Sequence, residues 1–244
     1  MRWIGWGALG AGTVGMGALL LGPPPWLFDW LAARFPGCLY RVPMQAPAVA
    51  LTLDDGPDPV STPLILSELR RHGARATFFL IAERVRGRDE LARRLVAERH
   101  EIGNHFTRDR ASIRLDHDRF ARDLEHAHEA LAPFGPVRWA RPGSGWYSQA
   151  MIATMAEQGY RCALGSVYPY DAAIPSADFS IRHILRNVRP GAILVLHDGG
   201  ARGRRTARVL QTILPELKRR GFRVVTLSDL IAIQETTNPA RSSW

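Results

Sequence analysis

Two adjacent carboxylates, Asp54 and Asp55, are the side chains in this sequence best placed to do chemistry. They follow the apolar run 50–53 and precede Gly56 and Pro57, so they lie where a short strand ends and the chain turns. Adjacent acids repel each other unless a cation or a proton separates their roles. The pattern favours one carboxylate on a metal ion and its neighbour as a base, although Asp-Gly-Pro is also common in ordinary turns.

Three later segments carry further reactive side chains. His105 and Asp109 are four residues apart, a spacing that places both on one face if the segment forms a helical turn. Arg141 begins an Arg-Pro-Gly segment, and a planar guanidinium is suited to orienting a carboxylate through paired hydrogen bonds. His197 directly follows the apolar run 193–196, and histidine is the side chain that most readily serves as an acid near neutral pH.

Taken in order, these segments resemble the signature blocks of the polysaccharide deacetylases. The family is also known as the NodB-homology domain or carbohydrate esterase family 4. The resemblance rests on Asp54-Asp55, His105-x-x-x-Asp109, Arg141-Pro-Gly and Leu196-His197, and it covers roughly residues 49–230. Each block alone is weak, whereas four in order at plausible spacing are specific. The resemblance implies a distorted, incomplete (β/α) barrel that removes acetyl groups from a glycan with the help of a metal ion.

The resemblance also assigns a metal site. It makes Asp54 the general base and Asp55 a metal ligand, with His105 as the second ligand. The family's usual second histidine is replaced here by Asp109, which we expect to be the third ligand. An aspartate adds negative charge and harder oxygen character, so we expect one divalent ion, zinc foremost, with manganese or cobalt as alternatives.

By the same resemblance, Arg141 orients Asp54 and His197 is the general acid. Asp171 is the expected carboxylate partner that tunes the pKa of His197, with Asp198 as the alternative. After Arg141-Pro142, where the family's block continues with a proline and an aromatic residue, this chain reads Gly143-Ser144-Gly145-Trp146, and the backbone amides of this turn could contact an oxyanion.

Three residues are expected to contact the substrate. Trp146 and Tyr147 follow the Gly-Ser-Gly turn and could stack on a sugar ring, although a place in the core is an equal alternative. Leu196, next to the expected acid, is the third.

The rest of the domain alternates short apolar segments with amphipathic ones, which is typical of a parallel β/α arrangement with its site at the carboxyl ends of the strands. The segment 101–104 leads into the third helix. We expect strands at 49–53, 76–81, 137–140, 162–167, 192–196 and 223–227, and helices at 63–72, 88–98, 116–131, 148–158, 179–187 and 206–219.

Four regions are expected along the chain. Residues 1–25 form a hydrophobic segment that is uncharged from Trp3 to Gly22 and just long enough to cross a bilayer. We interpret it as an N-terminal anchor helix, with a cleaved signal and a buried helix as alternatives. An amphipathic segment and linker (26–47), the deacetylase domain (48–234) and a short tail (235–244) follow. The expected location is the membrane, with the domain outside the cytoplasm; secretion is the alternative.

Composition adds limits. The formal charge is +9, but Lys218 is the only lysine, and the arginines are dispersed except in the run 202–208, which favours a solvated helix start. Because no binding motif accompanies them, we expect no nucleic-acid partner. Cys38 and Cys162 permit one disulfide without requiring it.

The sequence therefore predicts a metal-dependent N-deacetylase acting on an acetylated amino-sugar polymer or glycolipid. An O-acetyl esterase is the closest alternative, because the same tetrahedral chemistry applies to esters. A catalytically silent, membrane-tethered carbohydrate-binding protein is the alternative from another class. Substitution of the usual histidine by Asp109 and the altered Arg-Pro-Gly block motivate it.

Overall fold

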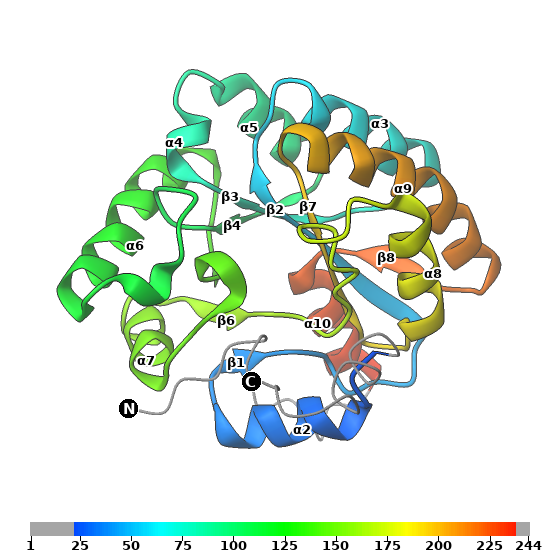
Figure 1. Ribbon diagram of the computed structural model, residues 1–244, viewed down its shortest axis with the longest axis horizontal. Helices are drawn as coiled ribbons and strands as arrows, with labels where there is room; N and C mark the ends of the chain where they lie inside the picture. The colour runs from blue at the N-terminus through cyan, green and yellow to red at the C-terminus, as the bar shows by residue number, and fades with distance from the viewer. Residues whose placement is uncertain (1–21, 238–244) are drawn as a thin grey trace.

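The computed structural model describes residues 22–237, and the expected N-terminal anchor lies almost entirely outside these residues. Parallel strands form one curled sheet with helices packed around its outside (Figure 1). The strands are β1 (Cys38–Leu39), β2 (Ala48–Gly56), β3 (Thr77–Leu80), β4 (Glu101–Asn104), β5 (Trp139–Ala140), β6 (Arg161–Ala163), β7 (Ile193–His197) and β8 (Arg223–Val225).

Helices connect most of the strands. They are α2 (Pro25–Arg34), α3 (Ser61–His72), α4 (Ala82–Val85), α5 (Asp89–Ala97), α6 (His117–Leu131), α7 (Gln149–Glu157), α8 (Ala177–Asn187), α9 (Gly200–Arg219) and α10 (Leu227–Thr237). Short 3-10 turns are η1 (Ser112–Arg114), η2 (Ala132–Phe134) and η3 (Gly143–Gly145).

The sheet order is β1-β6-β5-β4-β3-β2-β7, and β8 pairs with β2. All the strand pairs are parallel, so the carboxyl ends of the strands meet at one end of the curled sheet. The curl brings the segment after β6 next to β7, where the Val167 amide approaches the Ile193 carbonyl at 3.1 Å. This arrangement is the incomplete barrel that the family resemblance implies.

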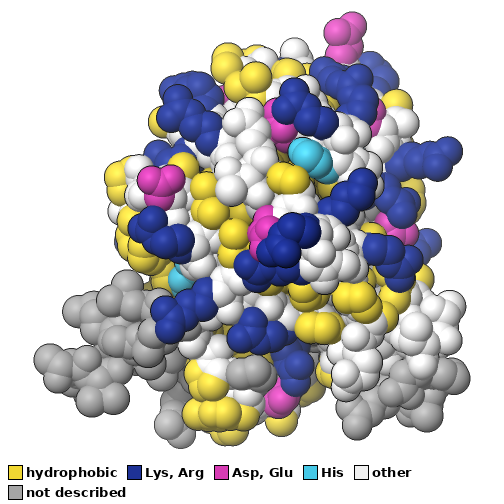
Figure 2. Space-filling view, turned by 90° about the vertical axis from the view of Figure 1, so that its right-hand side faces the viewer, with side chains coloured by type: hydrophobic (Ala, Val, Ile, Leu, Met, Phe, Trp, Pro, Cys, Tyr) yellow, Lys and Arg dark blue, Asp and Glu magenta, His cyan; other side chains and the backbone are white. Residues whose placement is uncertain are grey.

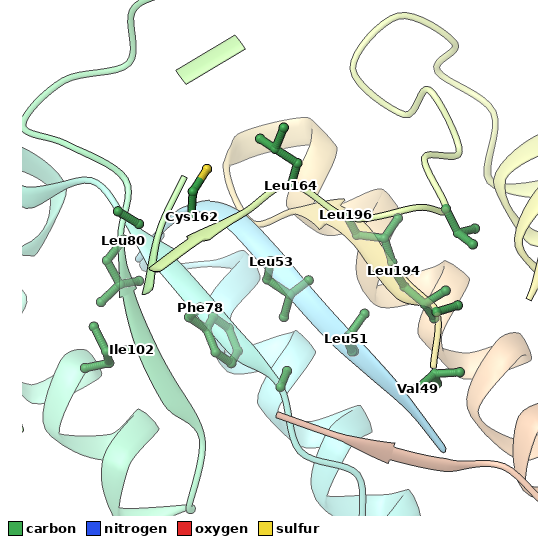
Figure 3. Packing of buried hydrophobic residues seen from close by; sticks show 14 of the residues in the cluster. Val49, Leu51, Leu53, Phe78, Leu80, Ile102, Cys162, Leu164, Leu194 and Leu196 are labelled. Atoms are coloured by element: carbon green, nitrogen blue, oxygen red, sulfur yellow. The ribbon is translucent and has the colours of Figure 1, made fainter. Parts of the chain in front are cut away.

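Side chains of β2 alternate between two cores. Val49, Leu51 and Leu53 face the helices and pack with Phe78 and other apolar residues of the neighbouring strands (Figure 3). Ala48 and Ala50 face the opposite side, inside the curl. Burying side chains of this size stabilises the fold by about 1.5–3 kcal/mol for each large one. The alternation also decides the site, because Thr52 and Asp54 continue the inner face.

The predicted linker contributes to the sheet. Residues 38–39 form β1, which pairs with β6 so that Cys38 and Cys162 are register partners with their Sγ atoms 3.4 Å apart as free thiols. The amphipathic pattern of 26–40 places Leu31 and Phe35 in the core, together with Phe28. Trp26 and Trp30, which share the predicted apolar face, are instead 67% and 51% exposed.

Other differences lie at element ends. The expected strand 162–167 stops at Ala163, the expected strand 223–227 stops at Val225, and α10 begins at Leu227. The short helix α4 was not expected. In the described residues 22–237, no helix is long and apolar enough to cross a membrane.

Basic side chains are spread over the surface beside α8 and α9. Figure 2 shows Lys and Arg side chains separated by acidic, apolar and neutral ones on this face, without a single continuous basic stripe. The arginine run 202–208 lies in the first turns of α9, where Arg204 and Arg208 are exposed.

Candidate active site

A bulge at the end of β2 turns two neighbouring carboxylates toward one pocket. In a regular strand Asp54 and Asp55 would point to opposite faces. Here the register with β3 shifts between Asp54 and Gly56, and Asp55 adopts a φ of 72°, in the left-handed region. Such a conformation is uncommon for residues other than glycine but is tolerated better by aspartate than by most. Both side chains therefore line the same cavity, which has a volume of about 390 Å³.

Asp54 is held by a buried guanidinium. Arg141 Nη1 donates to Asp54 Oδ1 at 2.5 Å and to Thr52 Oγ1 at 2.8 Å, and Arg141 Nε donates to the Ala163 carbonyl at 2.7 Å. The guanidinium lies over the ring of Phe79, 4.1 Å from its centroid. These contacts fix Arg141 on three sides, so it orients the Asp54 carboxylate, through one hydrogen bond and not the expected pair.

His197 lies beside Asp54, because the two are register partners on β2 and β7. Its Nδ1 is 2.9 and 3.0 Å from the two oxygens of Asp171, the expected partner. Burial alone lowers the pKa of His197, but the hydrogen bond and charge of Asp171, with the charges of Asp54 and Asp55, raise it to about 9. The imidazole is therefore protonated at neutral pH.

Asp198, the alternative partner, points away from the pocket. It is fully buried and accepts hydrogen bonds from Ser61 Oγ and Thr62 Oγ1. Burial raises the pKa of Asp198 to about 6, although these hydroxyl groups lower it. Its role is to connect the end of β7 to the start of α3.

Asp55 and His105 face each other across the pocket floor. His105 Nε2 is 3.5 Å from Asp55 Oδ1, and both side chains are only 7% exposed. The Nδ1 atom lies 2.7 Å from the Arg141 carbonyl, which can only accept, so Nδ1 carries the proton and Nε2 is left toward Asp55. Burial raises the pKa of Asp55, but when His105 also carries a proton on Nε2, its hydrogen bond and charge outweigh burial and hold that pKa well below its usual range.

Asp109, the expected third ligand, is not brought to this pair. Its side chain is 52% exposed and its Oδ2 accepts a hydrogen bond from Arg84 Nη2 at 2.8 Å. Within residues 22–237, no group of three or more His, Cys, Asp or Glu side chains is arranged to hold a metal ion. The expected helical turn does not form, because Phe106 takes a φ of 65° directly after His105.

The donor set therefore fits a divalent ion through two protein ligands. Two donors 3.5 Å apart can share one ion, and the hydrogen bond from His105 Nδ1 to a carbonyl fixes the tautomer that a ligating Nε2 requires. Asp109 lines the rim of the same cavity without joining the pair.

The three expected substrate residues lie elsewhere. Tyr147 is 2% exposed, and its hydroxyl pairs with that of Tyr40 at 2.7 Å, so it is a core residue. Leu196 is fully buried in the core facing the helices, because strand alternation turns Val195 and His197 toward the pocket instead. Trp146 is half-buried and does not line the cavity.

The apolar wall of the cavity comes mainly from segments that the motifs do not include. This wall comprises Leu164, Tyr168, Tyr170, Ala172, Ala173, Val195 and Pro23. On the remaining side lies the turn η3. The Gly143 amide donates to Ser112 Oγ at 2.9 Å and the Gly145 amide to the Pro142 carbonyl at 3.3 Å, so two of its three amides are already engaged.

Two further side chains were missed by the sequence reading. Arg202 lines the pocket with its Nη1 3.2 Å from Asp55 Oδ2, and Arg84 Nη1 donates to the Asp55 carbonyl. Arg202 lies in the run interpreted as a solvated helix start. Its place five residues after His197, at the start of the next helix, was the available signal, because the start of a helix that follows a catalytic strand faces the site.

Comparison with known proteins supports the family. Residues 41–163 match the polysaccharide deacetylase family. A peptidoglycan-N-acetylglucosamine deacetylase of Bacillus cereus is 36% identical over 196 residues, covering 79% of this chain and 92% of that protein. A chitooligosaccharide deacetylase of Bradyrhizobium is 36% identical over 197 residues, covering 75% of this chain and 90% of that protein.

Solved structures agree. A peptidoglycan N-acetylglucosamine deacetylase has a TM-score of 0.76 and 30% identity, covering 83% of this chain and 95% of that one. A family 4 acetyl xylan esterase from Clostridium thermocellum, in complex with cobalt, has a TM-score of 0.71 and 28% identity, covering 77% of this chain and 91% of that one. A CE4 family pseudoenzyme from Bacillus anthracis has a TM-score of 0.73 and 25% identity, covering 80% of this chain and 69% of that one. On these matches, and on the order of its motifs around one pocket, the chain belongs to the polysaccharide deacetylase family.

Proposed function

We propose that this protein is a metal-dependent hydrolase that removes N-acetyl groups from an amino-sugar polymer or glycolipid. The observation that carries the proposal is the pair of oriented groups at the ends of β2 and β7. Asp54, held by Arg141, and His197, held by Asp171, are register partners in one cavity. A base and a protonated acid side by side are what amide hydrolysis requires.

The chemistry follows from the positions of these two groups. Asp54 takes a proton from the attacking water as the C–O bond forms at the acetyl carbon. His197, protonated at neutral pH, gives a proton from Nε2 to the departing nitrogen as the C–N bond breaks, which leaves acetate and a free amine. A divalent ion held by Asp55 and His105 would act as a Lewis acid and lower the pKa of water.

The cavity has room for an acetylated sugar. Leu164 and Val195 line the cavity together with the carboxylates and imidazoles, and they can accept the acetyl methyl group. The two named relatives act on acetylated glycans by their names, which supports the same class of substrate here.

The experiment is acetate release from N-acetylated amino-sugar oligomers by the full-length chain. Parallel arms contain added zinc, cobalt or manganese, or a chelator, and an O-acetylated xylan serves as the second substrate. We expect release from the N-acetylated oligomers with metal and none with chelator. Release only from the xylan would favour the O-acetyl esterase instead.

The catalytically silent carbohydrate-binding protein remains the second candidate, and the position of Asp109 favours it. A site with two protein ligands, rather than the three expected, binds metal less strongly. Glycan binding by a folded, metal-supplemented protein without acetate release would support this candidate. Acetate release would remove it.

We also propose that the protein is anchored to a membrane with its domain outside the cytoplasm. The uncharged segment from Trp3 to Gly22 supports an anchor, and the exposed Trp26 and Trp30 directly after it suit the bilayer interface. Separation of membranes from soluble fractions, followed by protease treatment of intact cells, tests this. Recovery in the cytosolic fraction would contradict it.

A further inference from the structure

Two arginines neutralise the carboxylates of the expected metal site. Asp55 Oδ1 faces His105, while Asp55 Oδ2 is 3.2 Å from Arg202 Nη1. Asp109 is paired with Arg84 at 2.8 Å. Each carboxylate therefore has a guanidinium partner, and arginine stays charged at any pH at which the protein is folded.

The position of Arg202 is fixed by the fold. Arg202 lies in the first turn of α9, which packs so closely on the start of α3 that a Cβ at Gly203 would lie 2.2 Å from Ser61 Oγ. The first two turns of α9 are held by Gly200, whose amide donates to Asp58 Oδ2 at 3.1 Å, and by Thr206, whose hydroxyl donates to the His197 carbonyl at 2.8 Å. The helix therefore carries the guanidinium to the pocket.

Arg84 approaches Asp55 from the other side. Gly199 makes room for it, since a Cβ there would lie 3.1 Å from Arg84 Nη1 and 3.6 Å from the Asp55 Cβ. Arg84 binds the backbone of Asp55, whereas Arg202 binds its carboxylate. Of these two arginines, Arg202 is therefore the one that contacts the carboxylate a metal ion would bind.

We propose that Arg202 competes with the divalent ion for the Asp55 carboxylate and thereby keeps the metal affinity of this protein low. A cation at Asp55 and His105 meets a guanidinium on the same carboxylate, and the like charges repel each other. Metal binding then requires Arg202 to move away or to be tolerated as a close positive charge. The proposal rests on the proposed metal site, but it concerns binding and not turnover.

The test measures the affinity of the full-length chain for Co²⁺ and Zn²⁺ by titration calorimetry. We compare the wild type with Arg202→Gln, which removes the charge, and Arg202→Lys, which keeps it. We expect Arg202→Gln to bind the metal about ten-fold more tightly, the lower end of the effects of groups around metal ligands. Arg202→Lys should bind within a few-fold of the wild type.

Arg204→Gln is the matched control, because Arg204 is an exposed arginine in the same helix turn. It removes the same charge without a contact to Asp55 and should leave the affinity unchanged. Circular dichroism of each metal-free protein checks folding, and Arg202→Lys provides a second measurement if Arg202→Gln does not fold.

Unchanged or weaker binding by Arg202→Gln would overturn the proposal, since Arg202 would then be neutral toward the metal or an orienting partner of Asp55. An equal gain in Arg204→Gln would overturn it too, by showing a general effect of charge. Tighter metal binding by Arg202→Gln without acetate release would uphold the competition and remove the proposed function. Failure of the competition and failure of the proposed function therefore give different results.

Discussion

The acid–base side of the site and its metal side differ in how their carboxylates are held. Asp54 pairs with Arg141, whose side chain is 3% exposed, and Asp171 is 6% exposed beside His197. On the metal side, Asp109 is 52% exposed and its partner Arg84 is 32% exposed. Buried charges keep their geometry because losing a partner is costly, whereas exposed pairs contribute little. The acid–base side is therefore preorganised by buried pairs, whereas on the metal side the buried Asp55 and His105 are flanked by the exposed ion pair of Arg84 and Asp109.

The largest effect should come from the preorganised side. Asp54→Asn or His197→Gln is expected to lower kcat by about 10²–10⁴-fold, since each removes one proton-transfer group. Initial rates of acetate release at saturating metal measure this. Asp118→Asn, an exposed acid on α6, is the control. Retained activity in Asp54→Asn would show that the base is another group.

The second-largest effect should be a difference in unfolding free energy between variants of the acid–base side and of the metal side. Arg141→Met leaves Asp54 buried without its cation and should cost about 3–5 kcal/mol of unfolding free energy. Asp109→Asn breaks only the exposed pair with Arg84 and should cost less than about 1 kcal/mol. Denaturant titrations of both variants, without metal, give the comparison. Equal losses would mean that burial does not distinguish the two pairs.

Metal affinity should show which ligands the structure has assembled. His105→Ala removes one of the two proposed ligands and should weaken Co²⁺ binding by about 100-fold or more, since mutation of an outer-shell partner already costs about 10–100-fold. Asp109→Asn should weaken it by less than about ten-fold, because Asp109 is held by Arg84 and not by the His105 pair. Calorimetric titration measures both. A loss in Asp109→Asn as large as that in His105→Ala would make Asp109 a ligand after all.

The smallest effect is a shift in pH dependence. The acid form of His197 is needed and its pKa is raised to about 9, so kcat/KM should fall as the pH rises through this value. Asp171→Asn removes the largest contribution that raises this pKa, so the basic limb should move down by about one unit. The charges of Asp54 and Asp55 also raise the pKa of His197, and a metal ion at Asp55 would offset part of that charge. Both proteins are therefore compared at the same metal concentration. An unmoved limb would mean that Asp171 does not tune His197.

Much of the fold could be predicted because its signals are local. The apolar run before Asp54 and the helix-period faces in 63–72 and 116–131 fix their elements without distant contacts. β1 could not be predicted, because two residues carry no period and become a strand only by pairing with β6. The amphipathic pattern of residues 26–40 fits a membrane interface and packing on the domain equally well. Tertiary packing places Phe28, Leu31 and Phe35 in the core and leaves Trp26 and Trp30 exposed.

The same division holds for the site. The sequence by itself determined which residue types are present, their order, and the family to which they belong, since Asp54-Asp55, Arg141 and His197 are recognisable by type and spacing. Only the tertiary structure decided that Asp171 rather than Asp198 meets His197, that Tyr147 and Leu196 face a core, and that Arg202 meets Asp55. These are contacts between elements far apart in sequence. Strand alternation, the bulge at Asp55 and the packing of α9 set them, and none of the three follows from local residue pattern.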